Sequence, residues 1–153
     1  MISTERLKEI ALFKELSDVE LNKLSKGLKE AFYPKGTLIW EEGSTEQGLQ
    51  IIDSGKVKVT RMTQEGNRQV LAVLKANKFF GELSILDGRA HSASMEALED
   101  TRVFILRKAH MDRLLQDSPL TAFKIVSEMT IAISEILREM NNKFIKMVDY
   151  IWE

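Results

Sequence analysis

The strongest constraint on the fold is a series of short β-rich runs between Tyr33 and Leu106, separated by turns that mostly contain glycine. Runs of this length, bounded by turn signals, are typical of strands rather than helices. One turn, Glu65-Gly66-Asn67, predicts a hairpin between the runs on either side of it. Even spacing of short strands predicts an antiparallel sandwich, jelly roll or barrel. The runs are Thr37–Trp40, Leu49–Ile52, Lys56–Arg61, Arg68–Leu74, Ser92–Ala97 and Arg102–Leu106.

Helical patterns flank this region on both sides. Ser17, with Glu20 three residues later, forms a capping-box pattern that predicts a helix over about 17–31. Ser118-Pro119 predicts the start of a long helix over about 119–150, which contains no glycine or proline. We therefore expect an α+β, mainly β, fold in one domain spanning 1–153. It would comprise N-terminal helices (1–32), a jelly roll (33–107) and C-terminal helices (108–153).

The long helix carries an apolar seam with the spacing of a coiled coil. Its members recur at intervals of three and four residues, and they are Met129, Ile133, Ile136, Met140, Phe144, Met147 and Ile151. This pattern predicts a parallel homodimer through residues 129–151. Earlier on the helix we expect Phe123, Ile125 and Val126 to pack against the chain's own β unit.

Composition excludes several classes of function. The chain of 153 residues has no cysteine, a net charge of −1 and two histidines, His91 and His110. These features argue against disulfides, thiolate chemistry and a three-histidine metal site. No nucleophile–base pair suggests itself either, so we expect no catalytic residues and no metal. We also expect His110 to be exposed.

The charge pattern and the apolar runs bear on partners and location. Without a basic stripe, direct DNA binding is not expected. No apolar run is long enough for a membrane span, and the N-terminus lacks the apolar core of a signal peptide. We expect a cytoplasmic protein that does not engage a membrane.

Residues 80–94 combine the groups that a nucleotide needs. Gly81 allows a ligand close to its backbone, and Glu82 can accept hydrogen bonds from sugar hydroxyls. One helical turn over 83–86 would point free N–H groups at an anion. Arg89, His91 and Ser92 follow as donors to phosphate oxygens. An ordinary strand-to-helix corner remains the alternative interpretation of Gly81-Glu82.

The same stretch resembles the phosphate-binding cassette of the cyclic-nucleotide-binding domains of the catabolite activator and protein kinase A regulatory type. The family pattern is roughly F-G-E-[LM]-[AS]-L-L-D-G-x-P-R-[ST]-A-[ST]-V, and this chain has FGELSILDGRAHSASM at 80–95 without a gap. The resemblance covers about residues 10–150. Further markers are Leu12-Phe13, YPKGTLI at 33–39, Glu42-Gly43 and IIDSGKVKV at 51–59.

The resemblance implies a ligand and the roles of its contacts. The ligand would be cyclic AMP or cyclic GMP, with no other cofactor. Glu82 would accept from the ribose 2′-hydroxyl, and the backbone around Gly81, Leu83 and Ser92 would meet the phosphate. The remaining members of the expected ligand-binding set are Phe80, Ser84, Arg89, His91 and Ala93. The output would pass through the C-terminal helix to an unidentified protein partner.

Two positions depart from the family pattern. His91 stands where the family has an arginine that binds the phosphate, and a histidine carries charge only when protonated. If His91 binds as the imidazolium, affinity should be higher near pH ~6 than near pH ~8. Arg89 could substitute for it.

Ile136 and Leu137 occupy the places of the base-reading residues on the long helix, and apolar side chains cannot distinguish adenine from guanine.

Two alternative functions therefore stay open. The domain could be degenerate and serve as a dimeric scaffold or docking module. It could also be the regulatory half of a transcription regulator, since relatives carry a helix-turn-helix after the long helix.

Overall fold

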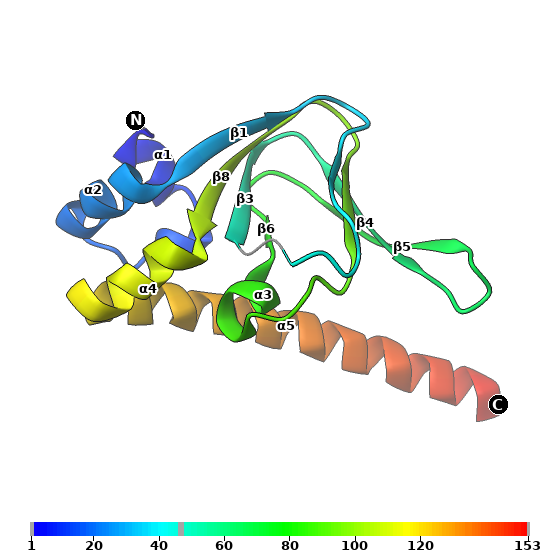
Figure 1. Cartoon of the computed structure of the whole chain (residues 1–153). Helices are drawn as coiled ribbons and strands as arrows, with labels where there is room; N and C mark the ends of the chain where they lie inside the picture. Colours follow the sequence, from blue (N-terminus) through cyan, green and yellow to red (C-terminus); the bar gives the residue numbers. More distant parts are fainter. Residues whose placement is uncertain (1, 46–47, 153) are drawn as a thin grey trace.

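The computed structural model describes residues 2–45 and 48–152, and its described strands form two antiparallel sheets (Figure 1). The first sheet has the strand order β1 (Lys29–Tyr33), β8 (Thr101–Arg107), β3 (Gly48–Ser54) and β6 (Phe79–Phe80). The second has the order β2 (Leu38–Trp40), β7 (Ser94–Ala97), β4 (Val57–Met62) and β5 (Arg68–Leu74). The predicted mainly-β fold with flanking helices is confirmed. β1 and β6 lie outside the predicted strands.

The helices gather at one end of the β unit and along one side of it (Figure 1). Three short helical elements precede β1, namely α1 (Thr4–Lys8), η1 (Ala11–Phe13) and α2 (Asp18–Gly27). α3 (Glu82–Asp87) follows β6, and α4 (Lys108–Asp117) follows β8. α5 (Pro119–Trp152) runs beneath the β unit and ends well away from the N-terminal helices (Figure 1).

Two apolar clusters hold these parts together. One lies between the sheets and includes Trp40, Ile52, Val57, Phe80 and Val103. The other joins the helices to the first sheet, with Leu21 and Ile125 among its fully buried members. The first cluster forms the wall on which the candidate site is built.

The hairpin prediction is confirmed. β4 and β5 pair in antiparallel register from Val57↔Leu74 to Met62↔Arg68. The Thr63 N–H donates to the Asn67 carbonyl across the turn at 2.7 Å. The hairpin projects from the body of the molecule (Figure 1).

The capping box is also confirmed, but the predicted helix is too long. The Glu20 N–H donates to the Ser17 hydroxyl, and the Glu20 carboxylate accepts from the Ser17 N–H. The helix ends at Gly27 rather than near residue 31, because Leu28 adopts an extended conformation and Lys29 begins β1. A side chain at Gly27 would overlap the His110 ring, so the last residue of α2 must be small where α4 packs against it.

His110 is buried, so the expectation that it is exposed is wrong. Its ring is 8% exposed and lies against Gly27. Burial, together with the positive charges of Arg113 and Arg107, lowers the pKa of His110 below its ordinary value. The sequence shows no sign of this because the contact joins two helices far apart in the chain.

The N-terminal part of α5 is fixed to the domain. Ala122, Ile125 and Met129 are fully buried. Glu20 accepts hydrogen bonds from Thr121 Oγ1 at 2.6 Å and from Lys124 Nζ at 2.7 Å. Burial opposes ionisation of Glu20, but the hydrogen bonds from Lys124, Thr121 and Ser17 prevail and lower its pKa to about 2.

One side chain on this segment departs from its prediction. Ile125 and Val126 pack on the domain as expected. Phe123 does not, because it is 67% exposed on the opposite side of the helix from the buried residues.

Beyond Met129 the helix loses its contacts with the core. Most large apolar side chains from Ile136 to Trp152 are about half exposed or more, whereas Val148 is partly buried. None of the described helices has a stretch that is both long and apolar enough to span a bilayer.

Candidate ligand-binding site

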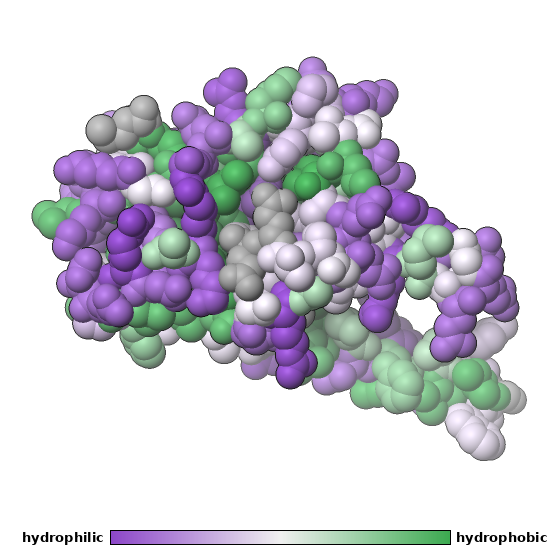
Figure 2. Space-filling view, in the orientation of Figure 1, coloured by the Kyte–Doolittle hydropathy of each residue, from purple (hydrophilic) through white to green (hydrophobic). Residues whose placement is uncertain are grey.

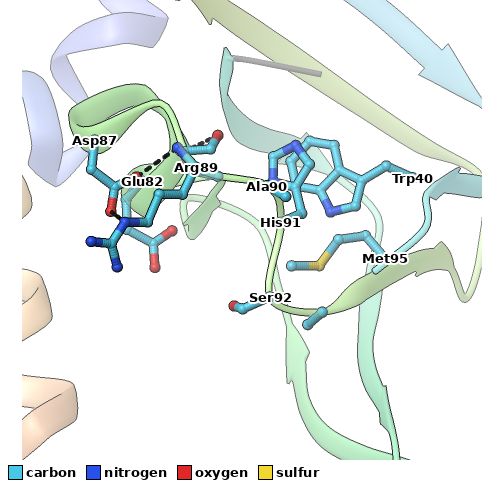
Figure 3. Close-up of a pocket in the computed structure, with 11 residues that line it drawn as sticks. Trp40, Glu82, Asp87, Arg89, Ala90, His91, Ser92 and Met95 are labelled. Atoms are coloured by element: carbon cyan, nitrogen blue, oxygen red, sulfur yellow. Dashed lines mark hydrogen bonds and ion pairs between the residues drawn. The ribbon is translucent and has the colours of Figure 1, made fainter. Parts of the chain in front are cut away.

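A cavity of about 230 Å³ opens beside α3 and the strands β2 and β7 (Figure 3). Its lining comes from the helix and loop of the cassette and from two strand residues. The cassette supplies Gly81, Glu82, Ser84, Asp87, Arg89, Ala90, His91, Ser92 and Ala93, and the strands supply Trp40 and Met95.

Gly81 sets the geometry at the entrance to α3. It has φ +87°, in the left-handed region that favours glycine. An added Cβ would collide with the Gly48 carbonyl oxygen and lie 3.0 Å from the Trp40 ring. The close approach of these backbones brings the first turn of α3, including Glu82, to the cavity wall.

Glu82 supplies one of two carboxylates that line the cavity, and Asp87 supplies the other. Glu82 is partly buried, and burial raises the pKa of its carboxyl above the ordinary value, opposed by a backbone hydrogen bond. A carboxylate with few protein partners is suited to accept hydrogen bonds from a polar ligand.

His91 lies flat against Trp40 on the opposite wall (Figure 3). The two ring centroids are 3.7 Å apart and the planes differ by 5°. The His91 backbone is fixed as well: its N–H donates to the Ser44 carbonyl at 2.9 Å, and its carbonyl accepts from Gly43 at 2.8 Å. The ring is therefore held in one orientation at 7% exposure.

Arg89 lines the cavity but extends into solvent. Its side chain is 86% exposed, and its Nε lies 3.9 Å from the Asp87 carboxylate. Figure 3 shows the guanidinium on the α3 side, beside Asp87 and away from the Trp40–His91 pair. The Arg89 backbone N–H donates to Asp87 Oδ1 at 2.9 Å, whereas the Arg89 Nε is too far from that carboxylate for a hydrogen bond.

The structure brings together most of the predicted site residues but not all of them. Ser84 helps to close the turn by donating to the Gly81 carbonyl at 3.2 Å. Phe80 is buried behind the cavity, edge-on to Trp40 with 5.0 Å between centroids. The backbone of Leu83 lies in the first turn of α3.

The predicted lid is not at the cavity. Ile136 and Leu137 are 51% and 55% exposed and are not among the residues that line it. Both side chains face solvent in this structure. That they cover the base of a bound ligand stays a prediction.

Sequence reasoning missed Trp40 and Met95. Met95 is the last residue of the cassette match but was not among the expected contacts, and Trp40 lies outside the cassette. Trp40 reaches the site through strand pairing, since β2 pairs with β7 with Trp40 opposite Met95. No local signal could have identified Trp40.

Among the described residues, no cluster of His, Asp or Glu side chains is suited to hold a metal ion.

Comparison with known proteins identifies the family. The sequence model of the cyclic nucleotide-binding domain matches residues 30–118, which is more than half of the chain. The chain belongs to the cyclic nucleotide-binding domain family. The match ends just before α5 begins, so the family assignment rests on the β unit and the cassette.

Individual relatives agree with the assignment. The cyclic AMP receptor protein of Thermus thermophilus is 30% identical over 135 residues, which are 88% of this chain and 62% of that protein. A cAMP-dependent protein kinase regulatory subunit from Yarrowia lipolytica is 31% identical over 109 residues, 71% of this chain and 28% of that protein. The first is named as a receptor and the second as a regulatory subunit. The chain thus spans less than two thirds of either relative.

A solved structure supports the fold. The cyclic nucleotide-binding domain from Methylobacillus flagellatus superimposes with a TM-score of 0.85 at 24% identity, covering 92% of this chain and 81% of that one.

Proposed function

We propose that this chain is a single regulatory domain, residues 1–153, that binds cyclic AMP or cyclic GMP in the cavity beside α3. The observation that carries the proposal is the ungapped cassette, folded so that Gly81 and Glu82 form one wall of that cavity. Glu82 would accept from the ribose 2′-hydroxyl, and the N–H groups at the start of α3 and near Ser92 would meet the phosphate. The proposed role is regulatory rather than catalytic, and the proposed location is the cytoplasm.

Two residues are candidates for the positively charged group that binds the cyclic phosphate. His91 is stacked on Trp40, so binding through its imidazolium must use the ring in its present plane. Arg89 is exposed and can rotate toward the cavity, where its guanidinium would form charge-assisted hydrogen bonds. The first route predicts binding that strengthens as pH falls from about 8 to about 6, and the second predicts no such dependence.

Calorimetric titration separates these possibilities. Cyclic AMP and cyclic GMP are titrated at both pH values into the wild-type chain and into the His91→Gln, Arg89→Gln and Glu82→Gln variants. Glu82→Gln should weaken binding by about tenfold or more, because a charge-assisted hydrogen bond contributes about 1.5–3 kcal/mol. Lys75→Gln, in an exposed turn outside the site, is the control. Wild-type binding that Glu82→Gln leaves unchanged would refute the proposed pocket.

We also propose that α5 forms a homodimer through residues 129–151. Figure 2 shows an apolar surface along the C-terminal end of this helix. Met140 and Phe144 are each 60% exposed, and Met147 and Ile151 are 54% and 67% exposed. Burying such side chains between two copies yields about 1.5–3 kcal/mol each, which can offset the entropy of association.

Sedimentation of the Phe144→Glu variant tests the dimer. A charge in the seam should convert the wild-type dimer to a monomer. Asn142→Glu places the same charge on the same helix outside the seam and should leave the dimer intact. A wild-type chain that is monomeric at tens of micromolar contradicts this part of the proposal.

A second function is favoured by a specific observation. Among the described residues that line the cavity, Arg89 is the one arginine or lysine, and its guanidinium extends into solvent away from the Trp40–His91 pair. A dimeric scaffold or docking module that has lost its nucleotide is consistent with that arrangement. Calorimetry that shows no binding of either nucleotide, together with a dimer in sedimentation, would favour it. The whole protein could also be a transcription regulator in which this domain is the regulatory part.

A further inference from the structure

A second cavity is lined by residues of α2, α4 and the position just before α5. Figure 1 shows α2 and α4 at the end of the domain that carries the N-terminus. We call this second cavity the basal cavity. Its volume is about 250 Å³ and its lining includes Lys23, Lys26, His110, Arg113, Asp117 and Ser118. It shares no residue with the cavity beside α3.

Positive charge dominates the polar lining of the basal cavity. Lys23, Lys26 and Arg113 face one carboxylate, that of Asp117. Within the part of the chain that the structure describes, none of these three cations forms an ion pair. Lys23 Nζ donates to the Ser118 hydroxyl at 3.0 Å and is thereby held at the cavity rim.

The N-terminus of α5 adds to this field. Ser118 immediately precedes the helix, and the positive end of a helix dipole attracts anions. At 34 residues α5 has a fully developed dipole. These local charges also act on His110: burial lowers its pKa, and the positive charges of Arg113 and Arg107 lower it further.

His110 is an independent indication of a ligand. The ring is more than nine-tenths buried and lines the cavity. Its Nδ1 has no hydrogen-bond partner among the described residues. A buried polar atom without a partner is unfavourable by about 1–3 kcal/mol, so such atoms call for an explanation.

We propose that the basal cavity binds a phosphate-class oxyanion between α2, α4 and α5. Lys26 and Arg113 would form charge-assisted hydrogen bonds to its oxygens, and Lys23 would contribute from the rim. The oxyanion would accept from the imidazole of His110, a ring whose Nδ1 lacks a partner in the protein. The cavity exceeds what a bare phosphate needs and leaves room for a small attached group.

The site joins the elements from which the long helix departs. Because Lys23 belongs to α2 and Arg113 to α4, a bound anion would tie both helices to the base of α5. This role does not depend on cyclic-nucleotide binding, and it can hold if the cavity beside α3 is empty.

The two histidines of the chain make the test direct. Their side-chain ¹H–¹³C signals are recorded while inorganic phosphate is added at constant pH and ionic strength, with chloride as the balancing salt. The His110 signals should shift saturably, while those of His91 report separately on the other cavity. Glu82→Gln should leave the His110 titration unchanged.

The matched variants are Arg113→Gln and Arg68→Gln, each of which removes one exposed arginine. Arg113→Gln should weaken the apparent phosphate affinity by about tenfold or more, and Arg68→Gln should not change it. His110 signals that do not move, that move equally with chloride, or that titrate identically in the two variants would overturn the proposal.

A phosphoserine peptide distinguishes the sources of the anion. Tighter binding of the peptide than of inorganic phosphate indicates a phosphorylated partner, and equal or weaker binding indicates a free phosphate compound.

Discussion

Replacing Gly81 with alanine tests the geometry that places the cassette. Gly81 has φ +87°, and so does Gly36 in the turn before β2. They differ in their surroundings: a Cβ at Gly36 would meet nothing within 4 Å, whereas at Gly81 it would collide with the Gly48 carbonyl oxygen. The pair therefore separates backbone strain from steric overlap.

The expected magnitudes follow from that difference. A non-glycine residue in the left-handed region costs about 1–2 kcal/mol, so Gly36→Ala should lower the free energy of unfolding by that amount. Gly81→Ala should add about 1–3 kcal/mol for the overlap with rigid backbone. The extra loss should be accompanied by weaker nucleotide binding, because α3 and Glu82 must shift.

Urea unfolding followed by tryptophan fluorescence measures both effects. Trp40 is 5% exposed in the core beside the cassette, whereas Trp152 is 83% exposed and should respond little. Calorimetry on each variant gives the change in nucleotide affinity. If Gly81→Ala is no more destabilising than Gly36→Ala, the close approach of the Gly81 and Gly48 backbones is not as described.

Three further predictions concern packing and ionisation. Trp40→Ala should lower the free energy of unfolding by about 3–5 kcal/mol. Trp40→Phe should lower it by less because it keeps a ring against His91, and circular dichroism in urea compares them. Replacing a helical glycine with alanine usually stabilises a protein, but Gly27→Ala should lower the melting temperature because the new Cβ would overlap the His110 ring. Adding His110→Ala should relieve the effect. An unchanged melting temperature in Gly27→Ala would contradict the contact. Because the folded-state pKa of Glu20 is about 2, its stabilising contribution is present above its ordinary pKa of 4.5 and is lost as pH falls toward 2. Glu20→Gln should therefore be less stable at neutral pH, with a shallower acid dependence of unfolding between about pH 5 and pH 2, and equal slopes would count against the network.

The sequence predicted the features that local patterns encode. Turn chemistry defined the hairpin at Gly66, and the Ser17–Glu20 capping box defined the start of α2. The cassette was recognisable because its ligand-facing groups lie within one short stretch of chain. Nine of its residues between Gly81 and Ala93 line a common cavity.

The remainder depended on contacts between distant segments. Trp40 reaches the cavity because β2 pairs with β7, and it then fixes the orientation of His91. The His110 ring is buried because Gly27, at the end of α2, has no side chain in the space that the ring occupies. Phe123 has the apolar character of a core residue, but its angular position on α5 places it in solvent. The outcomes at Trp40 and Gly27 cannot be derived from composition or periodicity, because they depend on contacts between distant segments.

The central claim is that the cassette binds a cyclic nucleotide, and the most direct test is a ¹H–¹⁵N chemical-shift titration of the chain with cyclic AMP and cyclic GMP. The account predicts saturable shifts that are largest at the amides of Gly81, Glu82 and Ser92 and at the indole N–H of Trp40, which line the cavity. Shifts that are absent with both nucleotides, or that centre on residues outside this cavity, would contradict it.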